Sequence, residues 1–455
     1  MLLYLLDLGG VGFLSTDEPR YASIGREMAH SGDWITPRLD GAAWFEKPPL
    51  LYWMVAAGHK AGLPDEWAAR LPVALLSVAF LLLMFHYVAQ EFSPKTGIAA
   101  VTILSTSAGW LAYSFGALTD LPMAAMLGAA MLFAFFEKRA WSGWAAGAAL
   151  GLAILAKAFV PVVLFAPLFF FARGKRIAIA TGCIAVAAPW HIACSLRNGP
   201  AFWNEYFWRQ QFGRFFTTER QHVQKWWFYV PVLLAGLFPW TPLAILLVLK
   251  STFEDRRMLH LGAWLVYGFV FFSASQNKLA GYLLPLMPGL ALLLAVGIDH
   301  ALKKSGIVAG LLAASAAFLM ALPTIAHALP EAMISGFAKT PVHLALGTPF
   351  VLVAGVVWWL SWSGKPTLAV LTVGMAVVFG AAYFKGSTFP ILDERVSARG
   401  FWRAHRDEVS GVCIDGIGRS WEYGLNYYAG QPFQECPAGK KPRITLINKS
   451  LAIQR

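Results

Sequence analysis

The feature that most constrains this chain is a series of apolar segments, each close to the length needed to cross a lipid bilayer as a helix. A helix needs ~20 mainly apolar residues to span the hydrocarbon core, because it rises only ~1.5 Å per residue. Of the 455 residues, 57% are hydrophobic and only 14% are charged. Backbone amides inside a bilayer must be satisfied internally, which favours helices over open sheets. The sequence therefore predicts an all-α polytopic membrane protein.

Windows of that length predict about 12–13 transmembrane helices along the chain. The first apolar segment, 1–14, is too short to span a bilayer, and it has neither the basic start nor the small-residue cleavage site of a removable signal peptide. We therefore expect a truncated or misassigned start. The other predicted spans are 68–89, 97–113, 119–136, 143–157, 158–172, 177–195, 226–249, 260–275, 279–298, 306–326, 342–362 and 367–384.

The basic residues of the short loops predict the orientation of these spans. Lys and Arg next to spans tend to stay on the cytoplasmic side. If loop 15–67 lies outside, every second loop lies inside, and loop 197–225, the short segment 276–278 and the tail 385–455 all share the outer face. The inner loops then carry Lys95, Lys138, Arg139, Arg173, Lys175, Arg176, Lys250, Arg256, Arg257, Lys303, Lys304 and Lys365.

We divide the chain into a transmembrane domain, 1–384, with long outer loops 15–67 and 197–225, and a small periplasmic appendage, 385–455. The appendage has strand-like runs at 412–414 and 444–447 around a predicted helix near 421–428. We therefore expect a small α/β unit after the last span. Short interfacial helices are expected in the outer loops.

The net charge of +12 comes only partly from the inner loops. Many cations of the outer loops run against the positive-inside trend, and cations at headgroup depth suit a lipid-linked phosphate or pyrophosphate. Membrane lipids are therefore expected partners, whereas nucleic acid is not, because no soluble basic domain is present. The outer-loop cations are Arg20, Arg26, Arg38, Lys47, Arg197, Arg209, Arg214, Arg220 and Lys225.

The four cysteines and the acidic residues give no metal-site spacing. Cys183 and Cys194 fall within one apolar span and are expected to be buried as small hydrophobic residues. Cys413 and Cys436 lie in the outer tail, where an oxidising compartment permits a disulfide, and the sequence leaves the bonded and free states equally open. We expect no obligatory cofactor, although outer-face carboxylates could recruit a divalent cation with waters.

The first outer loop holds two adjacent carboxylates at a predicted helix start. Thr16, Asp17 and Glu18 precede Pro19, and the apolar residues that follow recur at helical spacing. This pattern predicts an amphipathic helix lying along the membrane surface. The helix dipole stabilises carboxylates in the first turn. Asp17 and Glu18 therefore have two interpretations, as ordinary caps or as ionised groups available for chemistry.

Further along this loop, one lysine stands in a stiff frame. Lys47 precedes Pro48-Pro49, which restrict the backbone, and aromatic residues including Tyr52 flank it. Aromatic residues near span ends commonly form only an interfacial belt. Lys47, by contrast, lies on the wrong face for topology and can pair with an anionic headgroup. Asp120 is a second outer-face carboxylate at a membrane boundary, where ionisable groups are functional candidates and helix caps alike.

These motifs resemble the first periplasmic loop of bacterial polyprenyl-phosphate-dependent glycosyltransferases of the GT-C class, which include lipid A aminoarabinose transferases and protein O-mannosyltransferases. Later segments resemble the second long loop of that class and its lysine-containing segment, so the resemblance covers roughly residues 1–300. The matching runs are Asp17-Glu18-Pro19-Arg20-Tyr21-Ala22, Gly32-Asp33-Trp34, Phe45-Glu46-Lys47-Pro48-Pro49, Tyr52-Trp53, Phe207-Trp208-Arg209-Gln210-Gln211-Phe212-Gly213-Arg214-Phe215, Gln221-His222, Trp227-Phe228-Tyr229-Val230-Pro231, Phe238-Pro239-Trp240, Ser275-Gln276-Asn277-Lys278-Leu279 and Tyr282-Leu283-Leu284-Pro285.

The resemblance implies an enzyme of a bacterial inner membrane, with a periplasmic active site, that moves a sugar from a polyprenyl-phosphate donor to a lipid, glycan or protein acceptor. It places Asp17 at the reacting centre and Asp120 as the second acid, and we include the neighbouring Glu18. We expect a monomer. The residues expected to bind the donor and its phosphate are Lys47, Lys278, Arg209, Arg214, Tyr52, Tyr282 and His222.

The chemistry of such a transfer suits these residue types. Phosphate is a stable leaving group, so a general acid is scarcely needed, whereas a base that takes the acceptor proton contributes roughly 10²–10⁴-fold. Lysines near the leaving phosphate stabilise its developing charge. We expect a single displacement with inversion, and the sequence leaves a double displacement open.

Two rival classes remain at this level. A polyprenyl-linked lipid transporter or flippase would also be polytopic, but acids and bases near mid-span or paired broken helices, which typify transporters, are not evident. A non-catalytic envelope scaffold would leave the acidic loop unexplained. The appendage is also shorter than the terminal periplasmic domain of aminoarabinose transferases, so the resemblance says less about the acceptor.

Overall fold

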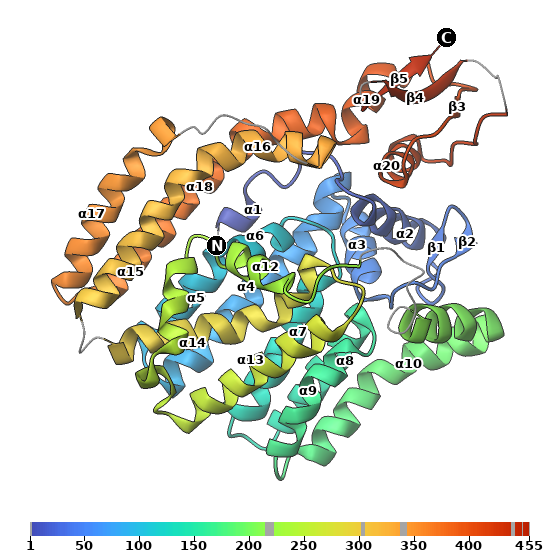
Figure 1. Cartoon of the computed structure of the whole chain (residues 1–455). Helices are drawn as coiled ribbons and strands as arrows, with labels where there is room; N and C mark the ends of the chain where they lie inside the picture. The colour runs from blue at the N-terminus through green and yellow to red at the C-terminus, as the bar shows by residue number, and fades with distance from the viewer. Residues whose placement is uncertain are drawn as a thin grey trace.

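The computed structural model describes residues 2–213, 223–301, 305–336, 344–437, 442–447 and 449–454. Helices dominate these ranges, and the strands are confined to one hairpin and the C-terminal appendage (Figure 1). Two predicted donor-binding residues, Arg214 and His222, lie outside the described residues.

The helices of the first half begin with a short turn and continue as a bundle. They are α1 (Leu2–Leu5), α2 (Asp17–Ser31), α3 (Leu50–Lys60), α4 (Asp65–Glu91), α5 (Pro94–Thr106), α6 (Ala108–Ser114), α7 (Asp120–Phe135), α8 (Ser142–Lys157), α9 (Val160–Phe171), α10 (Arg176–Phe202) and the π-helix η1 (Trp203–Gly213).

The second half is more broken, and short 3₁₀ segments join its longer helices. It comprises α12 (Tyr229–Leu237), η2 (Thr241–Val248), η3 (Lys250–Phe253), α13 (Arg256–Ala274), η4 (Ala280–Leu286), α14 (Met287–His300), α15 (Ser305–Phe318), η6 (Leu319–Ala321), α16 (Leu322–Ser335), η7 (Leu344–Gly347), α17 (Pro349–Trp362), α18 (Pro366–Arg395), α19 (Ala398–His405) and α20 (Arg419–Ala429).

The predicted class, an all-α polytopic membrane protein, is confirmed. Among the described residues, 7 helices are long and apolar enough to cross a membrane, or up to 8 if α12 and η2, bent by 114°, form one span. Helices α7, α8 and α9 are apolar but shorter. The count by length is therefore lower than the predicted 12–13, because several predicted spans correspond to short or interrupted helices.

Predicted span 97–113 shows why such interruptions escape a hydropathy pattern. Helix α5 ends before Ser107, whose backbone is extended, and α6 begins after it. The amide of Ala108, freed by the break, donates to the carbonyl of Phe238 at 2.8 Å. A buried backbone break needs such a partner, and this partner comes from a distant segment.

Small residues allow α8 and α10 to pack closely. A Cβ atom at Gly147 would lie 2.3 Å from the carbonyl oxygen of Ile179, and one at Gly182 would lie 2.8 Å from that of Trp144. Glycines on facing helices permit this approach of two backbones. The packing holds α8, and with it the lysine at its end, against the bundle.

The first outer loop forms a layer above one end of the bundle. Helix α2 lies between α3 and α20, and the antiparallel hairpin β1 (Arg38–Leu39) and β2 (Ala42–Ala43) extends beside it (Figure 1). The helix begins at Asp17, as predicted, but residues on several of its faces are buried. The C-terminal appendage therefore covers part of this helix, and its predicted place along the membrane surface stays a prediction.

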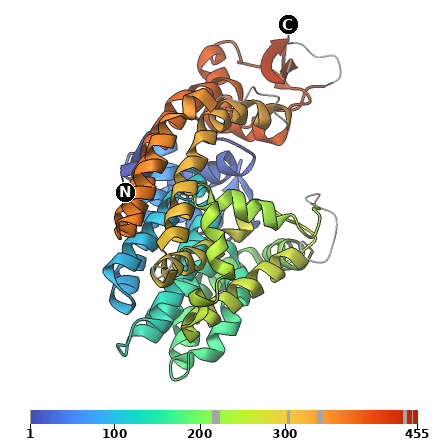
Figure 2. The same cartoon turned by 60° about the vertical axis from the view of Figure 1, so that its left-hand side comes forward.

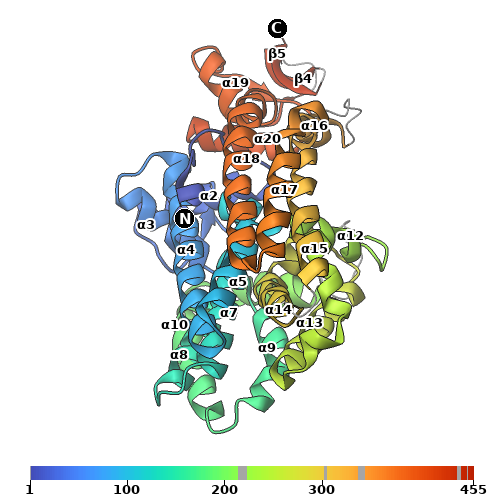
Figure 3. The same cartoon turned by 90° about the vertical axis from the view of Figure 1, so that its left-hand side faces the viewer.

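The appendage is a small α/β unit, as predicted. Strand β3 (Cys413–Ile414) pairs in parallel with β4 (Arg443–Ile447), which pairs antiparallel with β5 (Ser450–Gln454). A disulfide joins Cys413 to Cys436. The predicted boundary at residue 384 falls inside α18, which runs on from the bundle to Arg395. Figures 2 and 3 show the appendage at one end of the molecule, beyond α16 and α18.

Candidate functional site

Four side chains of the first outer loop form a row of alternating charge, here called the charged row: Asp17, Arg20, Glu46 and Lys47. Asp17 and Arg20 stand one turn apart on α2, and the guanidinium of Arg20 donates to Asp17 Oδ1 at 2.5 Å. Arg20 Nη1 lies 3.0 Å from Glu46 Oε2, and Lys47 Nζ lies 3.3 Å from Glu46 Oε1. The side chain of Asp17 is 45% exposed, whereas the other three are largely buried.

Aromatic rings and carboxylates hold Arg20 in place. Its guanidinium carbon lies 5.2 Å from the ring centre of Tyr21, 5.5 Å from that of Trp44 and 5.8 Å from that of Tyr423 on α20. Burial disfavours the charged guanidinium, but Glu46 and Asp17 outweigh this effect, so the pKa of Arg20 is raised. Arg20 is therefore a fixed cation that sets the positions of both carboxylates.

Tyr52, predicted to contact the donor, is fully buried beneath this row. Its ring lies 5.9 Å from that of Tyr21, and no described residue hydrogen-bonds its hydroxyl. Burial, and then the charge of Glu46, raise the pKa of Tyr52 well above its usual value. In this structure Tyr52 supports the charged row from below, and its contact with the donor stays a prediction.

The second predicted acid, Asp120, pairs with a lysine that the sequence did not single out. Asp120 begins α7 and Lys157 ends α8, and Lys157 Nζ donates to Asp120 Oδ1. Both side chains are largely buried, at 15% and 12% exposure. The ammonium of Lys157 also lies 4.8 Å from the ring centre of Tyr282. Asp120 is therefore a partner of a cation rather than a simple helix cap.

A glycine allows the η4 backbone to approach this pair. A Cβ atom at Gly281 would lie 2.5 Å from the Tyr113 hydroxyl and 2.6 Å from Asp120 Oδ1. Because such distances are too short for non-bonded atoms, any larger residue here would displace the carboxylate. The absence of a side chain at this position thus places Tyr282 beside Lys157.

The charged row and the Asp120–Lys157 pair meet at a cavity of about 120 Å³. Lys47 and Lys157 both line it, and Tyr282 forms part of its wall. Two ammonium groups at one small cavity create a site suited to an anion such as a phosphate. The remaining lining residues are Met123, Ala158, Val160, Gln210, Phe271, Phe272, Ser275 and Asn277.

Glu18 has a structural environment instead of a catalytic one. Its two carboxylate oxygens accept from Arg70 at 2.7 and 2.9 Å, and both side chains are almost fully buried. The amides of Leu14 and Ala117 also donate to it, at 2.9 and 3.1 Å. Four hydrogen bonds fill the acceptor sites of a carboxylate. These bonds favour a structural role for Glu18, and its part in the chemistry stays a prediction.

Lys278 is likewise committed to the protein itself. Its ammonium donates to the carbonyl oxygen of Ser275 and, at 3.3 Å, to that of Gln224. It does not line the cavity described above, although Ser275 and Asn277 do. In this structure Lys278 holds the segment that forms the cavity wall, and its contact with the donor phosphate stays a prediction.

Arg209 lies outside the cavity. It pairs with Glu205 at 3.0 Å along η1, and its side chain is 66% exposed. Its neighbour Gln210 lines the cavity instead. The helical turn points Arg209 away from this cavity, and its contact with the donor phosphate stays a prediction.

Sequence reasoning missed Lys157, and one signal could have found it. The residue falls between two short apolar runs, 143–157 and 158–172, where the predicted topology puts the outer face. A lysine at that junction runs against the positive-inside trend, as Lys47 does. Arg20 and Glu46 lay within the recognised motifs, but only the fold shows that they link Asp17 to Lys47.

Comparison with known proteins gives consistent matches. A family model described as dolichyl-phosphate-mannose-protein mannosyltransferase matches residues 46–194. The undecaprenyl phosphate-alpha-4-amino-4-deoxy-L-arabinose arabinosyl transferase of Photorhabdus laumondii is 31% identical over 362 residues, 72% of this chain and 65% of the relative. The transferase of the same name from Pseudomonas savastanoi is 30% identical over 374 residues, 76% of this chain and 68% of the relative.

Among solved structures, ArnT from Cupriavidus metallidurans bound to undecaprenyl phosphate matches with a TM-score of 0.75 and 23% sequence identity, over 96% of this chain and 84% of that chain. The fold is thus that of a GT-C membrane protein. The chain belongs to the family of polyprenyl-phosphate-dependent glycosyltransferases that contains these aminoarabinose transferases. It spans 65% of the length of the Photorhabdus relative.

Proposed function

We propose that this protein transfers a sugar from a polyprenyl-phosphate carrier to an acceptor at the periplasmic face of a bacterial inner membrane. The observation that carries this proposal is the cavity lined by Lys47 and Lys157. Lys47 pairs with a carboxylate of the charged row, which includes Asp17, and Lys157 pairs with Asp120. Cations at a small outer-face cavity suit a lipid-linked phosphate. The names of the related transferases and the undecaprenyl phosphate bound to ArnT support the same donor class.

In the proposed reaction, the bond between the anomeric carbon and a phosphate oxygen breaks as the acceptor oxygen bonds to that carbon. The electron pair of the broken bond stays with the phosphate, where Lys47 and Lys157 stabilise the added charge. The acceptor proton passes to the carboxylate of Asp17, the most exposed member of the charged row. Asp120 holds Lys157 in position, and the outcome is a single displacement with inversion.

For the substrates, we propose an undecaprenyl-type phosphate sugar, with 4-amino-4-deoxy-L-arabinose as the first sugar to test, and lipid A as the first acceptor. The related transferases are named for that sugar donor. We propose further that the protein acts as a monomer and needs no obligatory divalent cation, because the lysines supply the positive charge at the phosphate. Transfer that stops with EDTA and returns with Mg²⁺ would contradict the last point.

The test compares the wild-type protein with Asp17→Asn in nanodiscs that contain the donor and lipid A. We expect Asp17→Asn to lower kcat by roughly 10²–10⁴-fold, the contribution of a general base. Asp407→Asn is the matched control, because Asp407 is 94% exposed in the appendage. Equal transfer by folded Asp17→Asn and wild-type protein would refute the assignment. In sealed vesicles, movement of the intact donor across the bilayer without glycosyl product would favour a flippase.

A further inference from the structure

The segment between α1 and α2 has no regular secondary structure, yet side chains from distant elements bind its backbone. Arg70 on α4 donates from Nη1 to the carbonyl oxygens of Leu8 and Val11, at 2.7 and 2.6 Å. From Nη2 it donates to that of Gly12 at 3.0 Å. Buried backbone groups require partners, so these bonds help to fix the path of the loop.

The appendage supplies the other partners of this loop. Arg399 donates to the carbonyl oxygen of Gly9 at 2.7 Å, and the amide of Gly12 donates to Asp393 Oδ1 at 2.7 Å. The amide of Phe13 donates to the hydroxyl of Tyr428 at 2.9 Å. Three contacts to this segment, at Gly9, Gly12 and Phe13, therefore come from residues 393–428.

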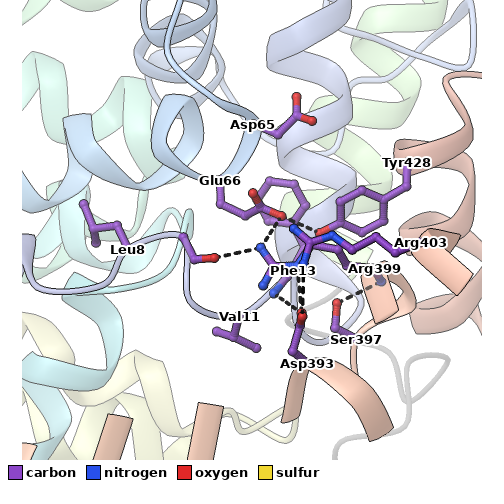
Figure 4. Close-up of polar contacts among 12 residues, drawn as sticks. Leu8, Val11, Phe13, Asp65, Glu66, Asp393, Ser397, Arg399, Arg403 and Tyr428 are labelled. Carbon is purple, nitrogen blue, oxygen red and sulfur yellow. Dashed lines mark hydrogen bonds and ion pairs between the residues drawn. The ribbon is translucent and has the colours of Figure 1, made fainter. Parts of the chain in front are cut away.

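These appendage residues are themselves joined, with Glu66 on α4, into a buried group that we call the polar clasp: Glu66, Asp393, Arg399 and Tyr428. Arg399 lies 3.1 Å from Glu66 Oε1 and donates to Asp393 at 2.8 Å, and the Tyr428 hydroxyl donates to Glu66 at 2.9 Å (Figure 4). The side chains of Arg399 and Glu66 are only 6% and 10% exposed. Charged hydrogen bonds screened from water are strong and directional.

The loop fits the clasp too closely for any side chain at Gly12. A Cβ atom there would lie 2.2 Å from Ser397 Oγ and 2.7 Å from both Arg399 Cβ and the Tyr428 hydroxyl. Because atoms at such distances must move apart, a shift of the clasp is passed directly to the loop backbone.

A short series of contacts connects the loop to the charged row. The loop carbonyls hold Arg70, and Arg70 binds both oxygens of Glu18. Glu18 also accepts from the amide of Leu14, which ties the loop to the first turn of α2. Asp17 is the residue immediately before Glu18, so the position of its carboxylate depends on that turn.

We propose that the appendage is a positioning element for Asp17, with Tyr428 and Arg399 as positioning residues that act through the loop and the Arg70–Glu18 pair. This inference rests on the proposed function, in which Asp17 takes the acceptor proton. The proposed donor phosphate site is the cavity at Lys47 and Lys157, and no clasp residue lines that cavity. Loosening the clasp therefore lowers kcat and leaves the KM for the donor unchanged.

Tyr428→Phe tests the inference with the loss of one hydroxyl. The ring of residue 428 still stacks on that of Phe13, with ring centres 6.0 Å apart. The backbone amide of Phe13, however, loses its acceptor, and Glu66 loses the hydrogen bond from the Tyr428 hydroxyl. We expect kcat to fall about 10-fold, because small misplacements of a reacting group are costly, while the KM for the donor stays within about twofold. Tyr383→Phe is the matched control, since no described residue hydrogen-bonds that exposed hydroxyl.

Arg399→Lys and Arg399→Gln form a second test. We expect a higher kcat for Arg399→Lys than for Arg399→Gln, because lysine keeps the positive charge. Arg443→Gln is its control, because Arg443 pairs with Asp415 inside the appendage, 2.6 Å away, without contact to the loop. A loss of kcat in Arg443→Gln as large as in Arg399→Gln would overturn the inference, since general weakening of the appendage would then explain both.

Hydrogen exchange gives a readout independent of catalysis. In Tyr428→Phe, amides of residues 12–18 should exchange faster than in wild-type and Tyr383→Phe proteins. Unchanged exchange there, or a raised donor KM with unchanged kcat, would refute the positioning role. If the wild-type protein transfers no sugar, the proposed function fails, and the exchange comparison still decides whether the appendage fixes the turn that carries Asp17.

Discussion

Lys157→Met is the substitution that most directly probes the cavity. The change keeps most of the length of the side chain and removes the ammonium that binds Asp120 and faces the cavity beside Lys47. Asp120 is then left largely buried and without its lysine, at 15% exposure. Breaking a buried pair from one side costs about 3–5 kcal/mol. We expect a loss of that order in the free energy of unfolding.

The same substitution has a separate effect on the reaction. One cation fewer at the leaving phosphate costs about 2.7–4 kcal/mol of transition-state stabilisation, which corresponds to about 10²–10³-fold in kcat. Steady-state kinetics with the polyprenyl-phosphate donor in nanodiscs measure this effect. Denaturant unfolding of the same samples measures stability, and Asp120→Asn with the double variant completes a cycle that isolates the energy of the pair.

Two results would refute this reasoning. If folded Lys157→Met keeps kcat/KM for the donor within about twofold of wild type, Lys157 does not stabilise the leaving phosphate. If the losses in stability of the two single variants simply add in the double variant, Lys157 and Asp120 do not form a pair that matters for folding.

Two further outcomes are expected. Gly281→Ala places a methyl group 2.5 Å from the Tyr113 hydroxyl and 2.6 Å from Asp120. We therefore expect about 10-fold lower kcat/KM for the donor. Gly236→Ala is the kinetic control, because a Cβ atom at Gly236 meets nothing closer than 3.9 Å. Burial lowers the pKa of His59 below its ordinary 6.5, so the stability it contributes is present above that pH and is lost as pH falls below it. Melting curves at pH 7.5 and pH 5.5 should therefore show a smaller loss for His59→Gln than for wild type.

Much of the helical layout could be predicted from the sequence, because the length and apolarity of a segment are local properties. Predicted spans 68–89 and 367–384, for example, correspond to α4 and α18. The bend between α12 and η2 and the break at Ser107 could not be predicted, because distant partners satisfy the exposed backbone. A hydropathy pattern does not indicate which distant residues become those partners.

The candidate site was predictable in its motifs but not in its roles. Asp17 and Glu18 are adjacent and chemically alike, and the sequence could not separate them. Arg70, 52 residues further along the chain, binds Glu18 and leaves Asp17 exposed. The same holds for two lysines: Lys278 donates to a backbone carbonyl, whereas Lys157 donates to Asp120. The role of each lysine depends on which acceptors the fold places nearby. The residue types were recognisable, whereas their partners required the three-dimensional structure.

The distance along the chain between the two halves of the polar clasp has a consequence for biosynthesis. Gly9 and Arg399 are 390 residues apart, and Phe13 and Tyr428 are 415 apart. At ~5–20 residues per second, a ribosome needs roughly 20–80 s to make the intervening chain. During that time the turn that carries Asp17 lacks its C-terminal support. A partly made chain would thus hold the carboxylate of Asp17 loosely until Arg399 and Tyr428 have been made and have reached their partners in the first loop.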